Sequence, residues 1–228
     1  MSSVPAESSE SLVSRETVGR QLFGERYELA VRYEEILRTD GVERGLIGPR
    51  ESGRMWERHL LNCAALGPAV PTGSTVVDVG SGAGLPGLVL AISRPDLAVC
   101  LVEPLLRRAT FLTEVVQRLG LSGVEVRRAR AEALHGRLLV DVVTARAVAP
   151  LERLAGWSLP LLRPGGVLLA LKGDLAQDEL AAAEPALPRL GAASWSIDVL
   201  GDGLVDPPVR VVRIVRSEID WRVDHAAP

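Results

Sequence analysis

The chain has 228 residues, of which 47% are hydrophobic, and its formal net charge is −3. This length and apolar content suit one globular domain with an appendage. Because no run of about 18 apolar residues is present, the sequence predicts no membrane-spanning helix. Residues 1–14 are rich in Ser and Glu and lack the features of a signal peptide, so we expect a disordered tail there. An acidic chain is not a general nucleic-acid binder, and any contact with RNA would come from local patches.

The cysteines and histidines indicate neither a disulfide nor a metal site. Cys63 and Cys100 are isolated thiols within apolar segments, which is typical of reduced core residues. The three histidines are scattered without ligand spacing, so no metal is expected. Together these features predict a cytoplasmic protein. Among the 26 Lys and Arg residues, Lys172 is the only lysine, which singles it out.

The N-terminal part is predicted to be helical. Apolar residues are spaced among charged ones over 15–38 as in one or two amphipathic helices, and a loop follows at 41–53. A further helix is predicted over 55–66, before Pro68, Pro71 and Gly73 break the pattern. We therefore expect residues 15–70 to form a helical cap.

From residue 75 onward, strand patterns alternate with helix patterns. Strands are predicted at 75–79, 97–102, 124–128, 138–144 and 166–172, with helices near 87–93, 105–119, 151–161 and 176–187. This alternation is typical of an α/β fold with a mostly parallel sheet and helices on both faces. The last two strands, near 194–200 and 209–216, lack a helix between them and are predicted to form an antiparallel hairpin. The core would span 71–222, followed by a tail at 223–228.

A glycine-rich segment follows the first predicted strand. The apolar run ends at Asp78, and Gly80, Gly82 and Gly84 then alternate along the bend. Glycines are required where a chain turns sharply or where a Cβ would collide with a ligand. The segment therefore predicts a strand–loop–helix unit whose backbone approaches a cofactor.

Two residues in this segment argue against a dinucleotide. The register Gly82–Gly87 fits the G-x-G-x-x-G fingerprint of dinucleotide-binding proteins. However, Pro86 removes one of the helix N–H groups that would bind a phosphate, and Asp78 places a negative charge near the expected phosphates. S-adenosylmethionine, which carries a sulfonium and an ammonium and no phosphate, avoids both problems and is the predicted cofactor.

Three further segments end strands on the same side of the predicted sheet. Glu103 follows the second strand, where an acidic residue is placed to accept hydrogen bonds from ribose hydroxyls. Ala131 and Glu132 follow the third strand, and Arg146 follows the fourth. Ligands of open α/β sheets bind at the carboxyl ends of the strands, so we expect these residues to line one cleft.

Other polar segments have simpler interpretations. Arg58 and His59 lie on the predicted cap helix, where a charged pair is usually solvated. The run Asp206-Pro207-Pro208 is similar to a motif of enzymes that methylate amino groups of bases, but it comes far later than the fourth strand and is predicted to be a turn.

With these residues identified, the chain resembles the bacterial glucose-inhibited division protein B family, the small-subunit rRNA guanine-N7 methyltransferases. The resemblance runs from about Arg20 to Arg216. Its motifs are Asp78-Val79-Gly80-Ser81-Gly82-Ala83-Gly84-Leu85-Pro86-Gly87, Arg58-His59-Leu60-Leu61, Ala145-Arg146-Ala147 and Ala170-Leu171-Lys172-Gly173. Two cap segments depart from the family pattern, Gly45-Leu46-Ile47 and Asn62-Cys63.

The resemblance implies a class I methyltransferase (Rossmann-like) fold with S-adenosylmethionine as cofactor. It implies methylation of a guanosine N7 in 16S rRNA, within the small ribosomal subunit. The cofactor-binding positions that it implies are Gly80, Leu85, Ala131, Glu132 and Arg146, to which the residue patterns add Gly82 and Glu103.

Guanine N7 has a free lone pair, so no general base is expected and Arg146 is predicted to position cofactor or RNA. Lys172, Arg58 and His59 are the candidates for contacting RNA phosphate or shaping the cleft. The alternatives are a class I methyltransferase for a small molecule or a protein, a nicotinamide-dependent dehydrogenase and a non-catalytic RNA-binding factor.

Overall fold

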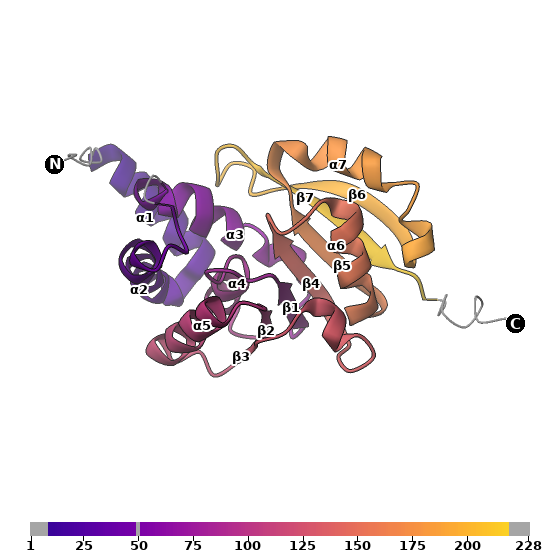
Figure 1. Ribbon diagram of the computed structural model, residues 1–228. Helices are drawn as coiled ribbons and strands as arrows, with labels where there is room; N and C mark the ends of the chain where they lie inside the picture. Colours follow the sequence, from indigo (N-terminus) through magenta and orange to yellow (C-terminus); the bar gives the residue numbers. More distant parts are fainter. Residues whose placement is uncertain (1–8, 49–50, 219–228) are drawn as a thin grey trace, which may run out of the picture.

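A computed structural model describes residues 9–48 and 51–218, with a helical cap beside an α/β core (Figure 1). The helices of the cap are α1 (Ser9–Phe23), α2 (Tyr27–Ile36), π-helical segments at Leu37–Gly41 and Trp56–Leu61, and α3 (Asn62–Ala64), with short 3-10 helices at Gly24–Arg26, Ser52–Arg54 and Gly67–Ala69. Helix α1 begins earlier than the predicted start at residue 15. The rest of the predicted N-terminal tail, residues 1–8, and the predicted C-terminal tail lie outside the described residues.

The strands form one seven-stranded sheet in the described part of the chain. They are β1 (Thr75–Val79), β2 (Ala98–Val102), β3 (Val124–Arg127), β4 (Val140–Arg146), β5 (Leu162–Leu171), β6 (Ala192–Leu200) and β7 (Val209–Arg216). Their order is β3-β2-β1-β4-β5-β7-β6. The strands β1 to β5 are parallel, and β7 pairs antiparallel with both β5 and β6. The predicted parallel sheet with a final antiparallel hairpin is therefore confirmed.

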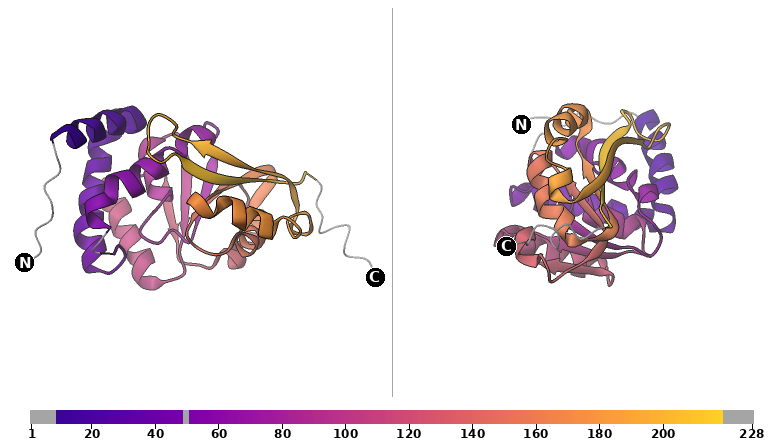
Figure 2. Two further views of the ribbon diagram at one scale, coloured as in Figure 1. Left: turned by 90° about the horizontal axis from the view of Figure 1, so that it is seen from above. Right: turned by 90° about the vertical axis from the view of Figure 1, so that its right-hand side faces the viewer.

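Side chains at alternate positions of each strand pack on opposite faces of the sheet. On one face, Val76, Leu101 and Val142 pack with the cap, α4 (Gly87–Ser93) and α5 (Leu106–Leu119). On the other face, Val77 and Val143 pack with α6 (Leu151–Ser158) and α7 (Ala176–Ala183). The period of two along each strand produces this division. Figure 2 shows the cap at one end of the sheet and the α6–α7 layer beside β5 to β7.

Several strand boundaries differ from the predicted ones, most of them by one or two residues. Strand β4 runs to Arg146, two residues beyond the predicted end, because its pairing with β5 continues through Arg146 and Leu171. Strand β5 begins at Leu162 rather than at 166 and includes Pro164, Gly165 and Gly166, which are accommodated by a register shift in its pairing with β4. Both cysteines are free and buried, as predicted. In the described part of the chain, no helix is long and apolar enough to cross a membrane.

Candidate active site

The carboxyl ends of β1 to β4 bring the predicted cofactor residues to one edge of the sheet. Gly80 and Gly82 follow β1, Glu103 follows β2, Ala131 and Glu132 begin a 3-10 helix (Ala131–Leu134) after β3, and Arg146 ends β4. Because β1 to β4 are parallel neighbours, these residues converge as the sequence predicted.

The first two glycines of the loop need their positive φ angles. Gly80 has φ +68° and Gly82 has φ +59°, a region that favours glycine. A Cβ on Gly82 would meet nothing nearer than the carbonyl oxygen of Gly80, at 3.8 Å. The space above Gly82 is therefore open to an approaching ligand.

Gly84, which also has a positive φ, of 104°, is needed for packing as well. A Cβ on Gly84 would lie 2.4 Å from Cδ1 of Leu88 and 2.7 Å from the hydroxyl of Tyr33. That hydroxyl, on α2 of the cap, donates a hydrogen bond to the carbonyl of Ala83 at 2.8 Å. The cap thus fixes the outer part of the loop through a contact that the sequence alone did not indicate.

Asp78 lies beneath the loop and does not face the ligand side. Its side chain is fully buried, with Oδ2 accepting a hydrogen bond from the N–H of Gly87 at 3.1 Å and Oδ1 accepting one from Thr144 at 3.2 Å. Burial raises the pKa of Asp78 to about 7. The predicted charge therefore lies beneath the loop, and its effect on a nearby phosphate stays a prediction. Asp78 accepts the hydrogen bond of the Gly87 N–H, and Pro86 has no N–H. Neither position at the start of α4 can therefore donate to a phosphate.

Glu103 is held in place by backbone groups. Its buried carboxylate accepts hydrogen bonds from the N–H of Gly82 at 3.0 Å and from that of Leu105 at 2.9 Å. A carboxylate has about four acceptor sites, so these bonds leave acceptor capacity for ribose hydroxyls. Glu103 also ties the open glycine to the end of β2, and its ribose contact stays a prediction.

The remaining predicted cofactor residues follow the ends of β1 and β3. Ala131 is buried and Glu132 is exposed at the start of their 3-10 helix. Leu85 is buried, and its N–H donates to the carbonyl of Ser81 at 3.2 Å. Leu85 therefore contributes to the shape of the loop, and its contact with a cofactor stays a prediction.

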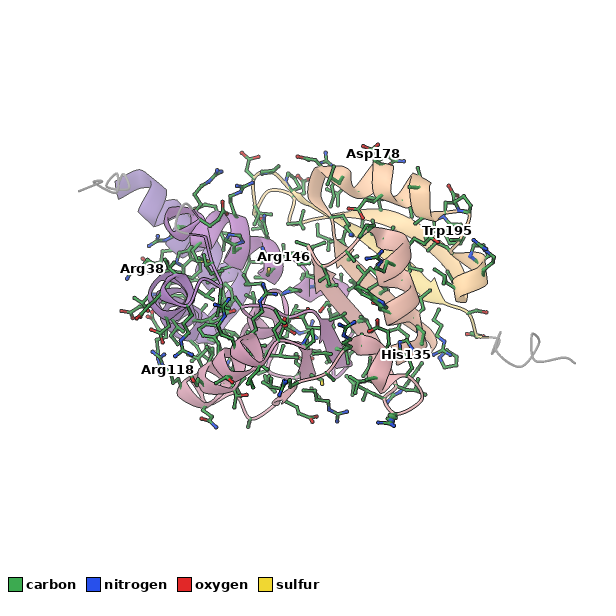
Figure 3. The ribbon with its side chains drawn as sticks, viewed as in Figure 1. Arg38, Arg118, His135, Arg146, Asp178 and Trp195 are labelled. Atoms are coloured by element: carbon green, nitrogen blue, oxygen red, sulfur yellow. The ribbon has the colours of Figure 1, made fainter. Side chains whose placement is uncertain are left out.

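Arg146 is hydrogen-bonded to the cap. Its Nη1 lies 2.8 Å from Nδ1 of His59, and Nε2 of His59 lies 3.0 Å from Oε2 of Glu51. Figure 3 shows Arg146 where the cap meets the strand ends. Burial and the charge of Arg146 lower the pKa of His59, although Glu51 acts in the opposite direction. His59 is therefore a partly buried partner of Arg146, not the solvated helix residue that its sequence suggested.

Lys172 is engaged within the protein. Its Nζ lies 2.7 Å from Oε2 of Glu179 and donates to the carbonyl of Ala149, and its side chain is only 5% exposed. Glu179 also accepts a hydrogen bond from the N–H of Leu151, at the start of α6. These contacts favour the prediction that Lys172 shapes the cleft over the prediction that it contacts an RNA phosphate.

A cavity of about 380 Å³ opens beside Arg146, a volume suited to a small ligand. The cap contributes the exposed Arg58, whose Nη1 lies 3.7 Å from Glu51. The connection between β6 and β7 contributes Asp206-Pro207-Pro208, so this predicted turn lies at the site although it is far from β4 in sequence.

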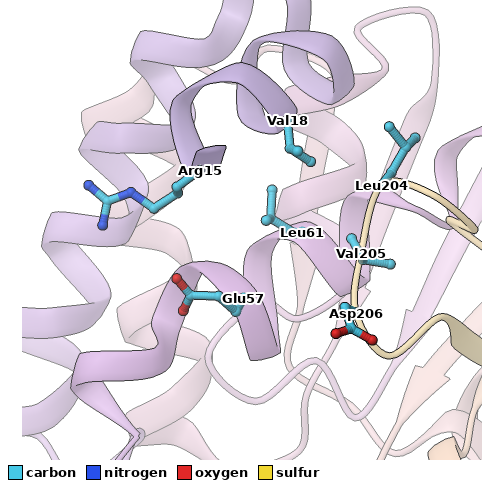
Figure 4. A pocket seen from close by; sticks show the side chains of 7 residues that line it. All are labelled: Arg15, Val18, Glu57, Leu61, Leu204, Val205 and Asp206. Carbon is cyan, nitrogen blue, oxygen red and sulfur yellow. The ribbon is translucent and has the colours of Figure 1, made fainter. Parts of the chain in front are cut away.

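A second cavity, of about 220 Å³, continues from the first and shares Glu57 and Asp206 with it. It lies between the cap and the β6–β7 connection (Figure 4). Its walls are formed by Arg15, Val18, Glu57, Leu61, Leu204, Val205 and Asp206. The two cavities follow the boundary between cap and core, and of the predicted cofactor residues only Arg146 lines them.

Comparison with solved structures identifies the class of fold. Precorrin-6y C5,15-methyltransferase from Geobacter metallireducens superposes with a TM-score of 0.52 at 16% identity, covering 75% of this chain and 91% of that chain. A 16S rRNA methyltransferase from T. thermophilus, in complex with AdoMet and guanosine, superposes with a TM-score of 0.53 at 19% identity, covering 70% and 43%. The fold is that of the class I methyltransferases, as predicted.

Comparison with known sequences identifies the family. The family model described as rRNA small subunit methyltransferase G matches residues 26–204. Proteins named ribosomal RNA small subunit methyltransferase G from Streptomyces avermitilis and Streptomyces coelicolor are 59% and 60% identical over 209 residues, covering 91% of this chain and 88% and 87% of theirs. The chain belongs to the rRNA small subunit methyltransferase G family, which confirms the resemblance, and it is a methyltransferase.

Proposed function

We propose that the protein transfers a methyl group from S-adenosylmethionine to N7 of a guanosine in 16S rRNA, within the small ribosomal subunit in the cytoplasm. The observation that carries the proposal is the open side of Gly82 directly beside the buried carboxylate of Glu103. A side chain would fill this space, so the glycine loop keeps room for a ligand next to an acceptor for hydroxyl groups. Membership of the family supports the rRNA substrate.

The residues around this space fit S-adenosylmethionine. Gly80, Gly82 and Leu85 would hold it along the loop, Glu103 would accept hydrogen bonds from the ribose, and Ala131 and Glu132 would flank the base. At the start of α4, Pro86 has no N–H and the N–H of Gly87 is already bonded to Asp78, so neither position can bind a phosphate. This suits a cofactor that has no phosphate group. When bound, S-adenosylmethionine supplies an electrophilic methyl group.

The chain's own contribution to the reaction is mainly orientation. Guanine N7 carries an in-plane lone pair, so no proton has to be removed before it attacks. Holding both partners in an in-line geometry contributes on the order of 7–11 kcal/mol in favourable cases. Arg146, at the wall of the cavity and fixed by His59, is placed to orient a base edge, a phosphate or the carboxylate of the cofactor.

RNA binding has to come from a local surface, because the whole chain is acidic. Arg54, Arg58 and Arg146 line the cavity and supply positive charge at the entrance to the site. We expect the ribosomal subunit to contribute further affinity by presenting the target in a fixed shape. Lys172 takes part by holding the loop that precedes α6.

The test is transfer of labelled methyl from S-adenosylmethionine to small ribosomal subunits and to naked rRNA, both from a strain that lacks the gene. Nucleoside analysis should give 7-methylguanosine. Label in a different nucleoside would overturn the N7 assignment but not the cofactor. Binding of the cofactor without transfer to either RNA form would favour a small-molecule or protein substrate, and binding of a nicotinamide dinucleotide instead would favour a dehydrogenase.

A further inference from the structure

His59 lies between two partners of opposite charge, Glu51 and Arg146. Its Nε2 is 3.0 Å from the Glu51 carboxylate and its Nδ1 is 2.8 Å from the Arg146 guanidinium. An ionised carboxylate only accepts hydrogen bonds and a guanidinium only donates them. The ring must therefore carry its proton on Nε2 and offer the lone pair of Nδ1 to Arg146. This arrangement requires the neutral imidazole.

We propose that His59 is a positioning residue for methyl transfer: anchored on Glu51 as a neutral imidazole, it accepts a hydrogen bond from Arg146 and fixes the guanidinium on the wall of the cavity. A guanidinium has five N–H donors in a rigid fork, so holding one of them sets the direction of the others. This role rests on the proposed function. Of the two roles predicted for His59, contacting RNA phosphate or shaping the cleft, it corresponds to the second.

The arrangement makes the orientation of Arg146 dependent on pH. A second proton, on Nδ1, would place an N–H donor and a positive charge against the Arg146 N–H, and the hydrogen bond would be lost. Burial and Arg146 lower the pKa of His59, so the neutral form dominates at pH 7 and is lost only at more acidic pH. We therefore expect methyl transfer to decline on the acid side of the ordinary histidine pKa of about 6.5.

Other titratable groups surround this pair and must be separated from it. Arg58 lies on the same helical segment and Glu51 precedes it, and both act on the pKa of His59. Asp78, on β1, interacts with Arg146 and has a pKa of about 7. An acid decline in activity could therefore come from Asp78, and the experiment needs variants that change His59 alone.

The experiment measures the single-turnover rate of methyl transfer to small ribosomal subunits between about pH 5 and 9. In His59→Asn, the amide oxygen takes the place of Nδ1 and does not titrate. At high pH we expect the rate of this variant to stay within about 3-fold of the wild-type rate. At acidic pH we expect its rate not to decline. In His59→Ala, which removes the acceptor, we expect the rate to fall about 10- to 100-fold with little change in KM for the subunits.

His135→Asn is the matched control. His135 is also partly buried, with Nε2 bonded to the carbonyl of Trp157, and it lies apart from Arg146 (Figure 3). This variant should keep the wild-type dependence of the methyl-transfer rate on pH. Glu51→Gln retains an acceptor for Nε2–H but removes the charge that raises the pKa of His59, so its acid decline should move to lower pH.

Two results would overturn the proposal. One is an acid decline that persists unchanged in His59→Asn, which would assign it to Asp78 or another group. The other is a wild-type rate in His59→Ala across the pH range. Nitrogen NMR of the His59 ring separates this question from the proposed function: a ring protonated on Nδ1 at ~pH 8 overturns the arrangement itself. Absence of methyl transfer by the wild-type protein, with the Nε2–H tautomer observed, overturns the proposed function and with it the role of His59 in transfer.

Discussion

Arg146 ends β4 and Lys172 follows the end of β5, its parallel neighbour, yet their charges have different partners. Arg146 is the last residue of β4 and pairs in the sheet with Leu171, the residue before Lys172. The guanidinium of Arg146 is bound by a histidine that must be neutral. The ammonium of Lys172 is buried against the carboxylate of Glu179 and the carbonyl of Ala149.

The difference shows that a position at the carboxyl edge does not by itself make a cation functional. A neutral acceptor holds Arg146 without cancelling its charge, which remains available to a ligand in the cavity. A carboxylate neutralises Lys172, whose contacts instead fasten the segment between β4 and α6. That segment includes Ala147, which has a positive φ of 53° and directly follows Arg146. Lys172 therefore acts on the shape of the site and Arg146 on what binds there.

The largest expected effect is on Arg146. Arg146→Ala should lower the single-turnover rate of methyl transfer at least about 100-fold, because it removes charge-assisted hydrogen bonds at the reacting site. The melting temperature should change little, since the side chain is only partly buried and His59 can bond to water instead. Arg146→Lys should recover only part of the rate, because an ammonium lacks the fork of donors. A wild-type rate in Arg146→Ala would remove Arg146 from the site.

Lys172→Ala should act mainly on stability. It leaves the carboxylate of Glu179 without its cation, and we expect a loss of about 2 kcal/mol in the free energy of unfolding, less than for a fully buried pair because Glu179 is partly exposed. Urea denaturation measures this loss. The double variant Lys172→Met with Glu179→Gln should recover part of it, because neither charge is then buried alone.

The salt dependence of subunit binding tests the contrast between the two cations. An arginine or lysine that contacts phosphate contributes about one unit to the slope of log affinity against log salt. Lys172→Ala should leave this slope unchanged, since its ammonium is already paired. A flatter slope in this variant would show that Lys172 leaves Glu179 and contacts RNA, and would overturn the comparison.

Asp78 is a third ionisable side chain near the site, and it differs from Arg146 and Lys172. It is fully buried, and it accepts hydrogen bonds without a cation in direct contact. Its folded-state pKa of about 7 lies above the unfolded value near 3.9, so the folded protein binds this proton more tightly. Asp78 therefore contributes stability at low pH that is lost as the pH rises toward 7, at about 1 kcal/mol per pH unit between pH 5 and 7. Asp78→Asn should flatten this part of the stability curve, as measured by urea denaturation at several pH values. An unchanged slope would contradict the raised pKa.

Much of the fold could be predicted from the sequence because its causes are local. The β-branched runs and the glycine loop set the order of strands and helices, and the parallel order brought Glu103 and Arg146 to one edge. The family resemblance rested on contiguous motifs, which need no three-dimensional information.

The partners of the polar side chains could not be predicted in this way. Glu51 belongs to a segment expected to be a loop, and its contact with His59 depends on how the cap folds back. Glu179 carries no motif, yet it neutralises Lys172 across the strand end. Asp78 was expected to place its charge near a bound phosphate, but the sequence did not indicate that its side chain is buried beneath the loop, where it accepts a hydrogen bond from the Gly87 N–H. Such contacts depend on packing between distant segments.

The smallest expected effect concerns the link between the cap and the glycine loop. Tyr33→Phe removes the hydroxyl that donates to the carbonyl of Ala83 and should cost about 1 kcal/mol in unfolding free energy. Because that bond steadies the glycine loop, affinity for S-adenosylmethionine should also fall, by about 2- to 5-fold in a binding titration. Tyr27→Phe is the matched control, since this tyrosine of the same helix packs its ring on Trp56 and does not reach the loop. Equal losses of cofactor affinity in both variants would mean that the cap acts on the loop through general packing and not through the hydrogen bond from Tyr33 to Ala83.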